Sequence, residues 1–141
     1  MAQARVHPIL TTELDEALVL ARLGREGLDP DRWRLDILDL MRDRSGGGVL
    51  VARDARGRLC GLLTYRIVPT GEDKPSLEVE RLTAFDLVDP RPVADALVAH
   101  AIREAKLQDC DSLRLVRPLD APAEAIALVL ASGVGDLHSV F

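Results

Sequence analysis

The chain has 141 residues, a net charge of −5 at neutral pH and an apolar content of 48%. This length and composition predict one folded domain over residues 1–141, with an aliphatic core, and exclude a disordered chain. The 18 basic residues form no cluster among 23 acidic ones, so we expect no nucleic-acid partner.

The amino terminus lacks the basic and apolar regions of a signal peptide, and no apolar run reaches the roughly 18 residues of a membrane span. Cys60 and Cys110 have neither metal-ligand spacing nor the density of a disulfide framework. The three histidines are far apart in sequence and have no cysteine partner. These features predict a cytoplasmic protein with reduced thiols, no metal site and no membrane partner.

Residues 4–10 are predicted to form a short edge strand, because Pro8 cannot donate a ladder hydrogen bond. Thr12 is predicted to cap the first helix, with Asp15 completing a capping box and glycines ending the helix after residue 23. A second helix is predicted to begin at Asp29-Pro30, an N-cap followed by proline at the first helical position.

A glycine-rich loop at 45–48 leads into a region of alternating apolar residues. Strands are predicted at 49–53 and 59–68, and a third antiparallel strand at 77–85 after a turn at 69–76. The clearest helix spans 92–106 and buries one apolar stripe. The remaining expected elements are a strand at 112–118, a helix at 122–132 and a last strand at 134–141.

The predicted order is β-α-α-β-β-β-α-β-α-β. One mixed sheet with helices on both faces buries all these apolar sides most simply, so the predicted fold class is α/β, or α+β.

Over nearly the whole chain this order resembles the fold of the GNAT acetyltransferases, which usually ends with two strands. In that family the fourth strand typically reads Glu-x-x-x-Leu-x-Val, and this chain has Glu78, Leu82 and Ala84 at those positions. The resemblance implies that Glu78 acts as a general base. It also implies that backbone groups at Leu82 and Ala84 contact the arm of acetyl-CoA or another acyl-CoA, and that the acceptor is a small-molecule or peptide amine.

The turn after this strand departs from the family pattern. The family's Arg/Gln-x-x-Gly-x-Gly/Ala loop holds the CoA pyrophosphate, whereas this chain reads 89-DPRPVA-94. Pro92 removes a backbone donor, and Asp89 brings a negative charge near two phosphates. One lost charge-assisted hydrogen bond costs roughly 1.5–3 kcal/mol, more than the roughly 0.3–1 kcal/mol that the helix dipole supplies.

If CoA binds at this turn, the remaining contacts are expected from the side chain of Arg91 and from backbone N–H groups. Those N–H groups belong to Arg91, Val93, Ala94 and Asp95. Many family members also carry a tyrosine that protonates the departing thiolate, and Val129 stands at its position. Two functions therefore stay open: an N-acyltransferase with a degenerate CoA site, or a non-catalytic GNAT-fold module for ligand or protein binding.

Further residues have two interpretations each. Glu78 and Glu80 alternate onto one strand face, where they are either a carboxylate pair for proton transfer or acids neutralised by Arg66 or Arg81. Trp33 either walls an acceptor pocket or packs in the core. The final strand ends in apolar residues without an expected closing partner, which predicts a homodimer through that strand.

Overall fold

The structure is a computed structural model that describes residues 4–25, 27–43, 46–71, 73–86 and 88–115. Five strands form one mixed sheet in the order β1-β2-β3-β4-β5, with β4 and β5 parallel and all other neighbours antiparallel. The strands are β1 Arg5–Pro8, β2 Gly48–Arg53, β3 Leu59–Thr70, β4 Asp73–Ala84 and β5 Ser112–Leu115. The helices are α1 Leu14–Gly24, α2 Pro30–Met41 and α3 Arg91–Leu107.

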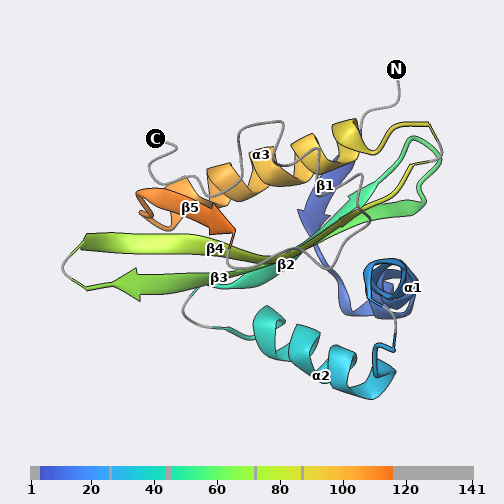
Figure 1. Cartoon of the computed structure of the whole chain (residues 1–141), viewed down its shortest axis with the longest axis horizontal. Coiled ribbons are helices and arrows are strands. Elements are labelled where there is room, and N and C mark those ends of the chain that lie inside the picture. The colour runs from blue at the N-terminus through green and yellow to red at the C-terminus, as the bar shows by residue number, and fades with distance from the viewer. Residues whose placement is uncertain (1–3, 26, 44–45, 72, 87, 116–141) are drawn as a thin grey trace.

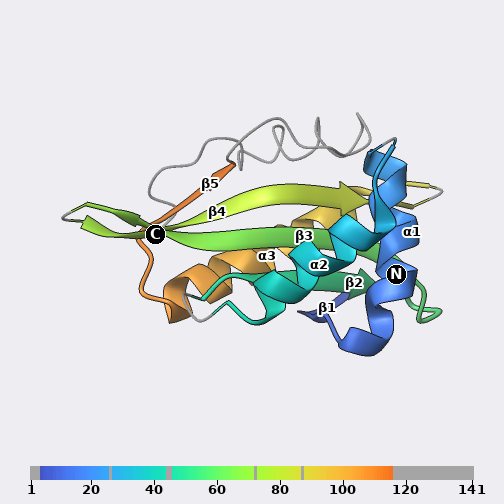
Figure 2. The same ribbon diagram turned by 90° about the horizontal axis from the view of Figure 1, so that it is seen from below.

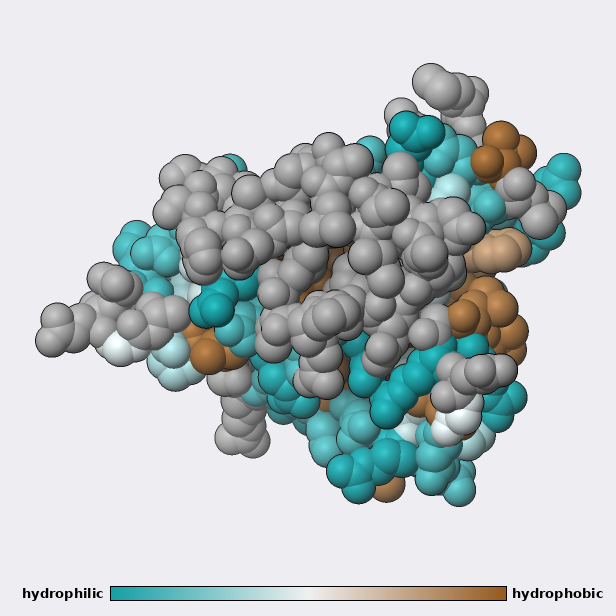
Figure 3. Space-filling model, in the orientation of Figure 1, coloured by the Kyte–Doolittle hydropathy of each residue, from teal (hydrophilic) through white to brown (hydrophobic). Residues whose placement is uncertain are grey.

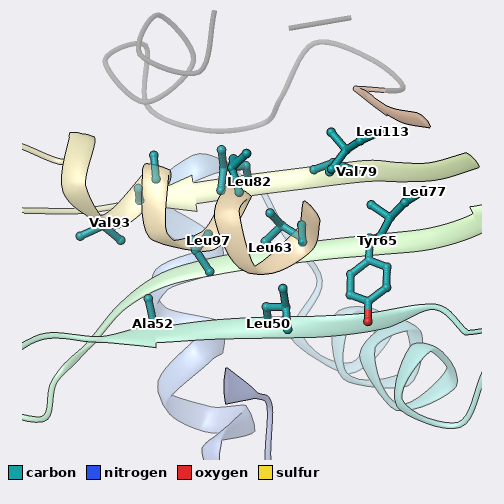
Figure 4. Close-up of a cluster of buried hydrophobic side chains, with 14 of the residues drawn as sticks. Leu50, Ala52, Leu63, Tyr65, Leu77, Val79, Leu82, Val93, Leu97 and Leu113 are labelled. Atoms are coloured by element: carbon teal, nitrogen blue, oxygen red, sulfur yellow. The ribbon is translucent and has the colours of Figure 1, made fainter. Parts of the chain in front are cut away.

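The helices lie on both faces of the sheet (Figure 1), so the predicted mixed fold is confirmed. α3 covers one face, and its apolar stripe packs against alternate residues of β2, β3 and β4. Figure 4 shows Leu63, Leu82 and Leu97 within this α3-side core. α1 and α2 cover the other face and form a second core with the intervening residues of β2 and β3.

α3 packs very closely against β3 at Gly61. A Cβ atom added there would lie 2.7 Å from Cγ1 of Val93 and 2.8 Å from Cδ1 of Leu97. Real side chains do not approach so closely, so only glycine fits this position without movement of the Val93 and Leu97 side chains or of α3.

The start of α2 is as predicted. The Asp29 carboxylate accepts hydrogen bonds from the N–H groups of Asp31, at 3.0 Å, and Arg32, at 3.4 Å. Pro30 occupies the first helical position, where no donor is needed.

The predicted start of the first helix is wrong. Thr12 lies within a short 3₁₀ turn, Thr11–Glu13, and α1 begins at Leu14. Glu13 provides the physical reason, because its carboxylate is buried and accepts the Leu10 N–H at 2.9 Å. Arg53 donates to the same carboxylate at 2.7 Å, and His7 lies 3.0 Å from it. These bonds hold Thr11–Glu13 in the 3₁₀ turn. Thr12 therefore lies inside a helical turn and cannot cap α1.

The predicted turn at 69–76 is also wrong. β3 and β4 continue until Thr70 pairs with Asp73, and Gly71 has the positive φ of +83° that such a tight turn needs. Pro75, a residue type that usually interrupts a strand, lies within β4. Its carbonyl accepts the N–H of Asp111, the residue before β5, at 3.3 Å.

β4 contains a β-bulge. Thr64 pairs with Arg81 while its neighbour Tyr65 pairs with Val79, so Glu80 is an additional residue in β4. As a result Leu77 and Val79 before the bulge, and Leu82 and Ala84 after it, all belong to the α3-side core.

Predicted elements at 122–132 and 134–141, and therefore the predicted dimer strand, lie outside the described residues. Among the described residues no helix is both long and apolar enough to span a bilayer. Figure 3 shows a mostly hydrophilic surface over α2, with hydrophobic side chains gathered at the right of the view near α1. α1 exposes 64% of Val19 and 55% of Leu23.

Candidate active site

An open cavity of about 520 Å³ lies on the side of the sheet covered by α1 and α2. β3 and β4 form its floor, and α1, α2 and the loop between them form its walls. The floor residues are Leu62, Thr64, Arg66, Glu80, Arg81 and Thr83; the wall residues are Ala21, Arg25, Gly27, Leu28, Asp29, Arg32, Trp33, Asp36, Ile37 and Leu40. This volume is in the range of small-molecule sites.

At the bulge in β4, the consecutive residues Glu80 and Arg81 both line the cavity. The Oε1 atom of Glu80 lies 2.8 Å from Nε of Arg66, and the Glu80 side chain remains 24% exposed. The expected neutralisation of a strand-face acid by Arg66 is confirmed for Glu80. The carboxylate is therefore both charge-compensated and accessible to a ligand.

Glu78 lies elsewhere. It is opposite Arg114 of β5, with 3.7 Å between Oε1 and the Arg114 guanidinium, and its side chain is 19% exposed. Glu78 does not line the described cavity. Sequence reasoning preferred Glu78 over Glu80 because Glu78 occupies the glutamate position of the family pattern. The signal for the bulge was the spacing of apolar residues, which is two from Leu77 to Val79 but three from Val79 to Leu82.

Leu82 and Ala84 have buried side chains in the α3-side core, so only their backbone groups can contact a ligand. The N–H of Phe85 donates to the carbonyl of Cys60 on β3 at 2.8 Å. Because backbone groups alternate along a strand, those of Leu82 and Ala84 point to the opposite edge of β4. On that edge the described pairing with β5 covers Ser76 to Val79, and β5 diverges from β4 (Figure 2).

The turn between β4 and α3 is organised by its own carboxylates. One Asp86 oxygen accepts the N–H groups of Val88, at 2.8 Å, and Asp89, at 3.1 Å. The hydrogen bonds from Val88 and Asp89 lower the pKa of Asp86, so this carboxylate is ionised at neutral pH. An internal anion thus already binds two backbone donors of the turn.

The first turn of α3 leaves few donors for a ligand. The Arg91 N–H donates to Asp89 at 3.0 Å, and the Arg91 side chain lies 3.3 Å from the same oxygen. Pro92 has no N–H, and the Ala94 N–H donates to the Pro90 carbonyl at 3.0 Å. In the described chain, Val93 is the first-turn residue whose N–H has no backbone partner of this kind. Asp95 lies one residue further along α3 with an exposed side chain.

Trp33 packs in the core of α1 and α2, as one of its two interpretations predicts, and it also lines the cavity. It is 6% exposed. The part of the chain that the structure describes contains no group of His, Cys, Asp or Glu side chains arranged to hold a metal ion.

No protein-family model matches the sequence, and no curated protein matches it. Solved structures do match. The aminoglycoside acetyltransferase AAC(6')-Iy, in complex with a CoA-containing bisubstrate analogue, is similar with a TM-score of 0.76 and 17% identity, over 99% of this chain and 94% of that one. The aminoglycoside 6'-N-acetyltransferase AAC(6')-Ih from Acinetobacter baumannii is similar with a TM-score of 0.74 and 17% identity, over 98% of this chain and 93% of that one.

A ribosomal-protein-alanine N-acetyltransferase from Brucella melitensis biovar Abortus 2308 is similar with a TM-score of 0.68 and 18% identity, over 94% of this chain and 91% of that one. The GNAT resemblance drawn from the order of elements is therefore confirmed at the level of structure. The chain has the fold of the GNAT acetyltransferases.

Proposed function

We propose that the protein is an acyl-CoA-dependent N-acyltransferase with a degenerate CoA site, acting on a small-molecule or peptide amine. The observation that carries this proposal is the cavity that reaches β4 at its bulge. An amine in the cavity and an acyl arm along the backbone of Leu82 and Ala84 would meet across one strand.

Acetyl-CoA or another acyl-CoA supplies an activated thioester when bound. The similar structure solved with a CoA-containing analogue supports this choice of donor. The chain itself must hold the amine beside β4 and accept its proton. Two carboxylates are candidates for this role: Glu80, which lines the cavity, and Glu78, which occupies the family position.

The turn at 86–94 does not fit a pyrophosphate well as it stands. Asp86 and Asp89 already accept three of its backbone N–H groups, and both carboxylates would repel phosphate. Each remaining neutral hydrogen bond contributes only about 0.5–1.5 kcal/mol. We therefore expect acetyl-CoA to bind with a Kd weaker than about 100 μM, which corresponds to roughly −5.5 kcal/mol.

Calorimetric titration of acetyl-CoA at low salt tests the proposal. The native chain should bind weakly, and the double variant Asp89→Arg/Pro92→Gly should bind more tightly because it restores a donor and reverses a charge. Asp15→Arg makes the same charge change in the first turn of α1 and should leave binding unchanged. Tight binding by the native chain would contradict the degenerate site and favour a fully competent acyltransferase.

The second candidate function is a non-catalytic module for ligand or protein binding. The self-satisfied turn favours it, because the structure needs no phosphate to complete those hydrogen bonds. If neither the native chain nor the double variant binds acetyl-CoA, this second function stands ahead of the first.

A further inference from the structure

The cavity is unusual for an acidic protein. The whole chain carries a net charge of −5, yet among the described residues four arginines and three acidic residues line the cavity. A site that binds a polycationic amine needs an excess of carboxylates. This lining has the opposite balance.

The three carboxylates are also already engaged. Glu80 pairs with Arg66 at 2.8 Å, and Asp36 with Arg32 at 3.4 Å. Asp29 accepts two backbone N–H groups as the N-cap of α2. A second or third positive charge on the ligand would find no carboxylate in the described lining that is not already compensated.

Arg25 is placed differently from the other guanidinium groups. It follows the last residue of α1, its side chain is exposed, and within the described residues it forms no ion pair. A guanidinium group binds a carboxylate with two parallel hydrogen bonds, so Arg25 is suited to an anionic group of a ligand in the cavity.

Apolar residues of α2 also line the cavity. Trp33, Ile37 and Leu40 of α2 line the wall, and all three are buried in the core behind it. A ligand that contacts both Glu80 and Arg25 therefore needs an amine for the carboxylate, an anion for the guanidinium group and an apolar part that fits against α2.

We propose that the acceptor is a zwitterion: a short peptide or amino-acid derivative with one free amine directed to Glu80 and one carboxylate bound by Arg25. This inference rests on the proposed function, because only an acyltransferase has an acceptor. It distinguishes this cavity from a site for polycationic amines such as aminoglycosides.

Trp33 makes the test direct, because it is the single tryptophan of the chain and lines the cavity. Its fluorescence is titrated with leucyl-leucine, with leucyl-leucine amide and with spermidine, at one ionic strength and without any acyl-CoA. The free dipeptide should give a saturable change with a Kd about tenfold lower than that of the amide, as loss of one charge-assisted contact implies. Spermidine should not saturate in the same range.

Arg25→Gln should remove the difference between the dipeptide and its amide, and Arg25→Lys should give an intermediate difference. Arg103→Gln changes an exposed arginine on α3, on the other side of the sheet, and should leave all three titrations unchanged. Because Arg25 is exposed, these variants should fold like the native chain.

Equal affinity for the dipeptide and its amide, tighter binding of spermidine, or no saturable change with either peptide would overturn the inference. Failure of the proposed function is separately visible. If the dipeptide binds through Arg25 but is not acylated in the presence of acetyl-CoA, the inference stands and the acyltransferase proposal fails. If spermidine is acylated and the dipeptide is not, the acyltransferase proposal stands and the inference fails.

Discussion

At the scale of single residues, Glu13 connects four parts of the chain through one buried carboxylate. It is 4% exposed and bonds to the Leu10 N–H, to His7 of β1 and to Arg53 of β2. Burial alone would raise the pKa of Glu13, but these hydrogen bonds outweigh it and the pKa is lowered. The ionised form is therefore the one that stabilises the fold.

This linkage predicts a pH dependence. Because the folded-state pKa of Glu13 lies below its unfolded value of 4.5, its contribution is present above about pH 4.5 and is lost as the pH falls through the folded pKa. Glu13→Gln should lower the free energy of unfolding at pH 7 by roughly 1–3 kcal/mol, and should flatten its fall below pH 4.5.

Urea unfolding at a series of pH values measures this effect. Glu16, Asp54 and Asp86 also have lowered pKa values, owing mainly to Arg53 for Glu16, to the Arg58 N–H for Asp54 and to the Val88 N–H for Asp86. A residual slope should therefore remain in the variant. Asp15→Asn removes a carboxylate whose side chain is 87% exposed and should behave like the native chain. An unchanged slope in Glu13→Gln would show that Glu13 does not provide the linkage.

The two candidate bases make a second prediction. If the protein transfers acyl groups, Glu80→Gln should reduce kcat by roughly 10²–10⁴-fold, the usual effect of losing a general base. Glu78→Gln should have a smaller effect, because Glu78 lies beside Arg114 and outside the cavity lining. Steady-state kinetics with both variants decide between them. A larger loss of kcat in Glu78→Gln than in Glu80→Gln would assign the general-base role to Glu78.

At the scale of elements, the contact between α3 and β3 depends on Gly61. Gly61→Ala should destabilise the fold by roughly 1–3 kcal/mol, because the added Cβ would overlap Val93 and Leu97. Leu97 is fully buried, and Leu97→Ala alone should cost about 2–5 kcal/mol. In the Leu97→Ala background, part of the Gly61→Ala cost should disappear, since one of the two overlapping side chains is gone.

Denaturant unfolding of the four forms gives the coupling energy. Simple additivity of the two substitutions would contradict the close contact seen at Gly61. The control is Gly57→Ala with and without Leu97→Ala: nothing lies within 4 Å of a Cβ at Gly57, so its cost reflects backbone strain alone and should add.

The elements show which parts of the fold the sequence could predict. α3 and the Asp29 cap of α2 follow from local patterns, namely a continuous apolar stripe and a side chain two residues from the N–H that it binds. Glu13 and Glu80 could not be placed in the same way. The position of Glu13 depends on Arg53, which is 40 residues away, and that of Glu80 depends on the register of β3 against β4. The dependence of Glu13 leaves no periodic signal, and the bulge beside Glu80 leaves only the change of apolar spacing from two to three.

The residues of the candidate site also divide into those that the sequence could predict and those that it could not. Trp33, Leu82 and Ala84 were predicted as site residues, and the structure places Trp33 at the cavity and the other two on the diverging edge of β4. The carboxylates that satisfy the turn were not predicted as acceptors, because the sequence gives the residue types but not the direction of a free N–H. The charge balance of the cavity was also missed, since it combines side chains from four elements.

At the scale of the whole molecule, self-association remains a prediction. The strand expected at 134–141 lies outside the described residues, and an apolar edge strand favours pairing between subunits. Sedimentation at micromolar concentration should show a dimer, and Phe141→Asp should shift the equilibrium toward monomer. Val19→Glu introduces a charge on the exposed apolar face of α1 and serves as the control. A monomeric native chain would contradict the prediction, and dissociation by Val19→Glu alone would move the interface to α1.

The additional residue in β4 has a genetic consequence. An in-frame loss of codon 80 would remove the bulge and leave Val79, Arg81 and Leu82 in regular alternation, so that Leu82 and Ala84 would still face α3 while the cavity would lose the Glu80 carboxylate. A codon lost from the hairpin turn near Gly71 would change only the connection between two strands. Among descendants of this gene, the fold should therefore tolerate a lost codon at position 80 as well as at the tip of the hairpin, and selection should keep codon 80 only where the cavity needs its carboxylate.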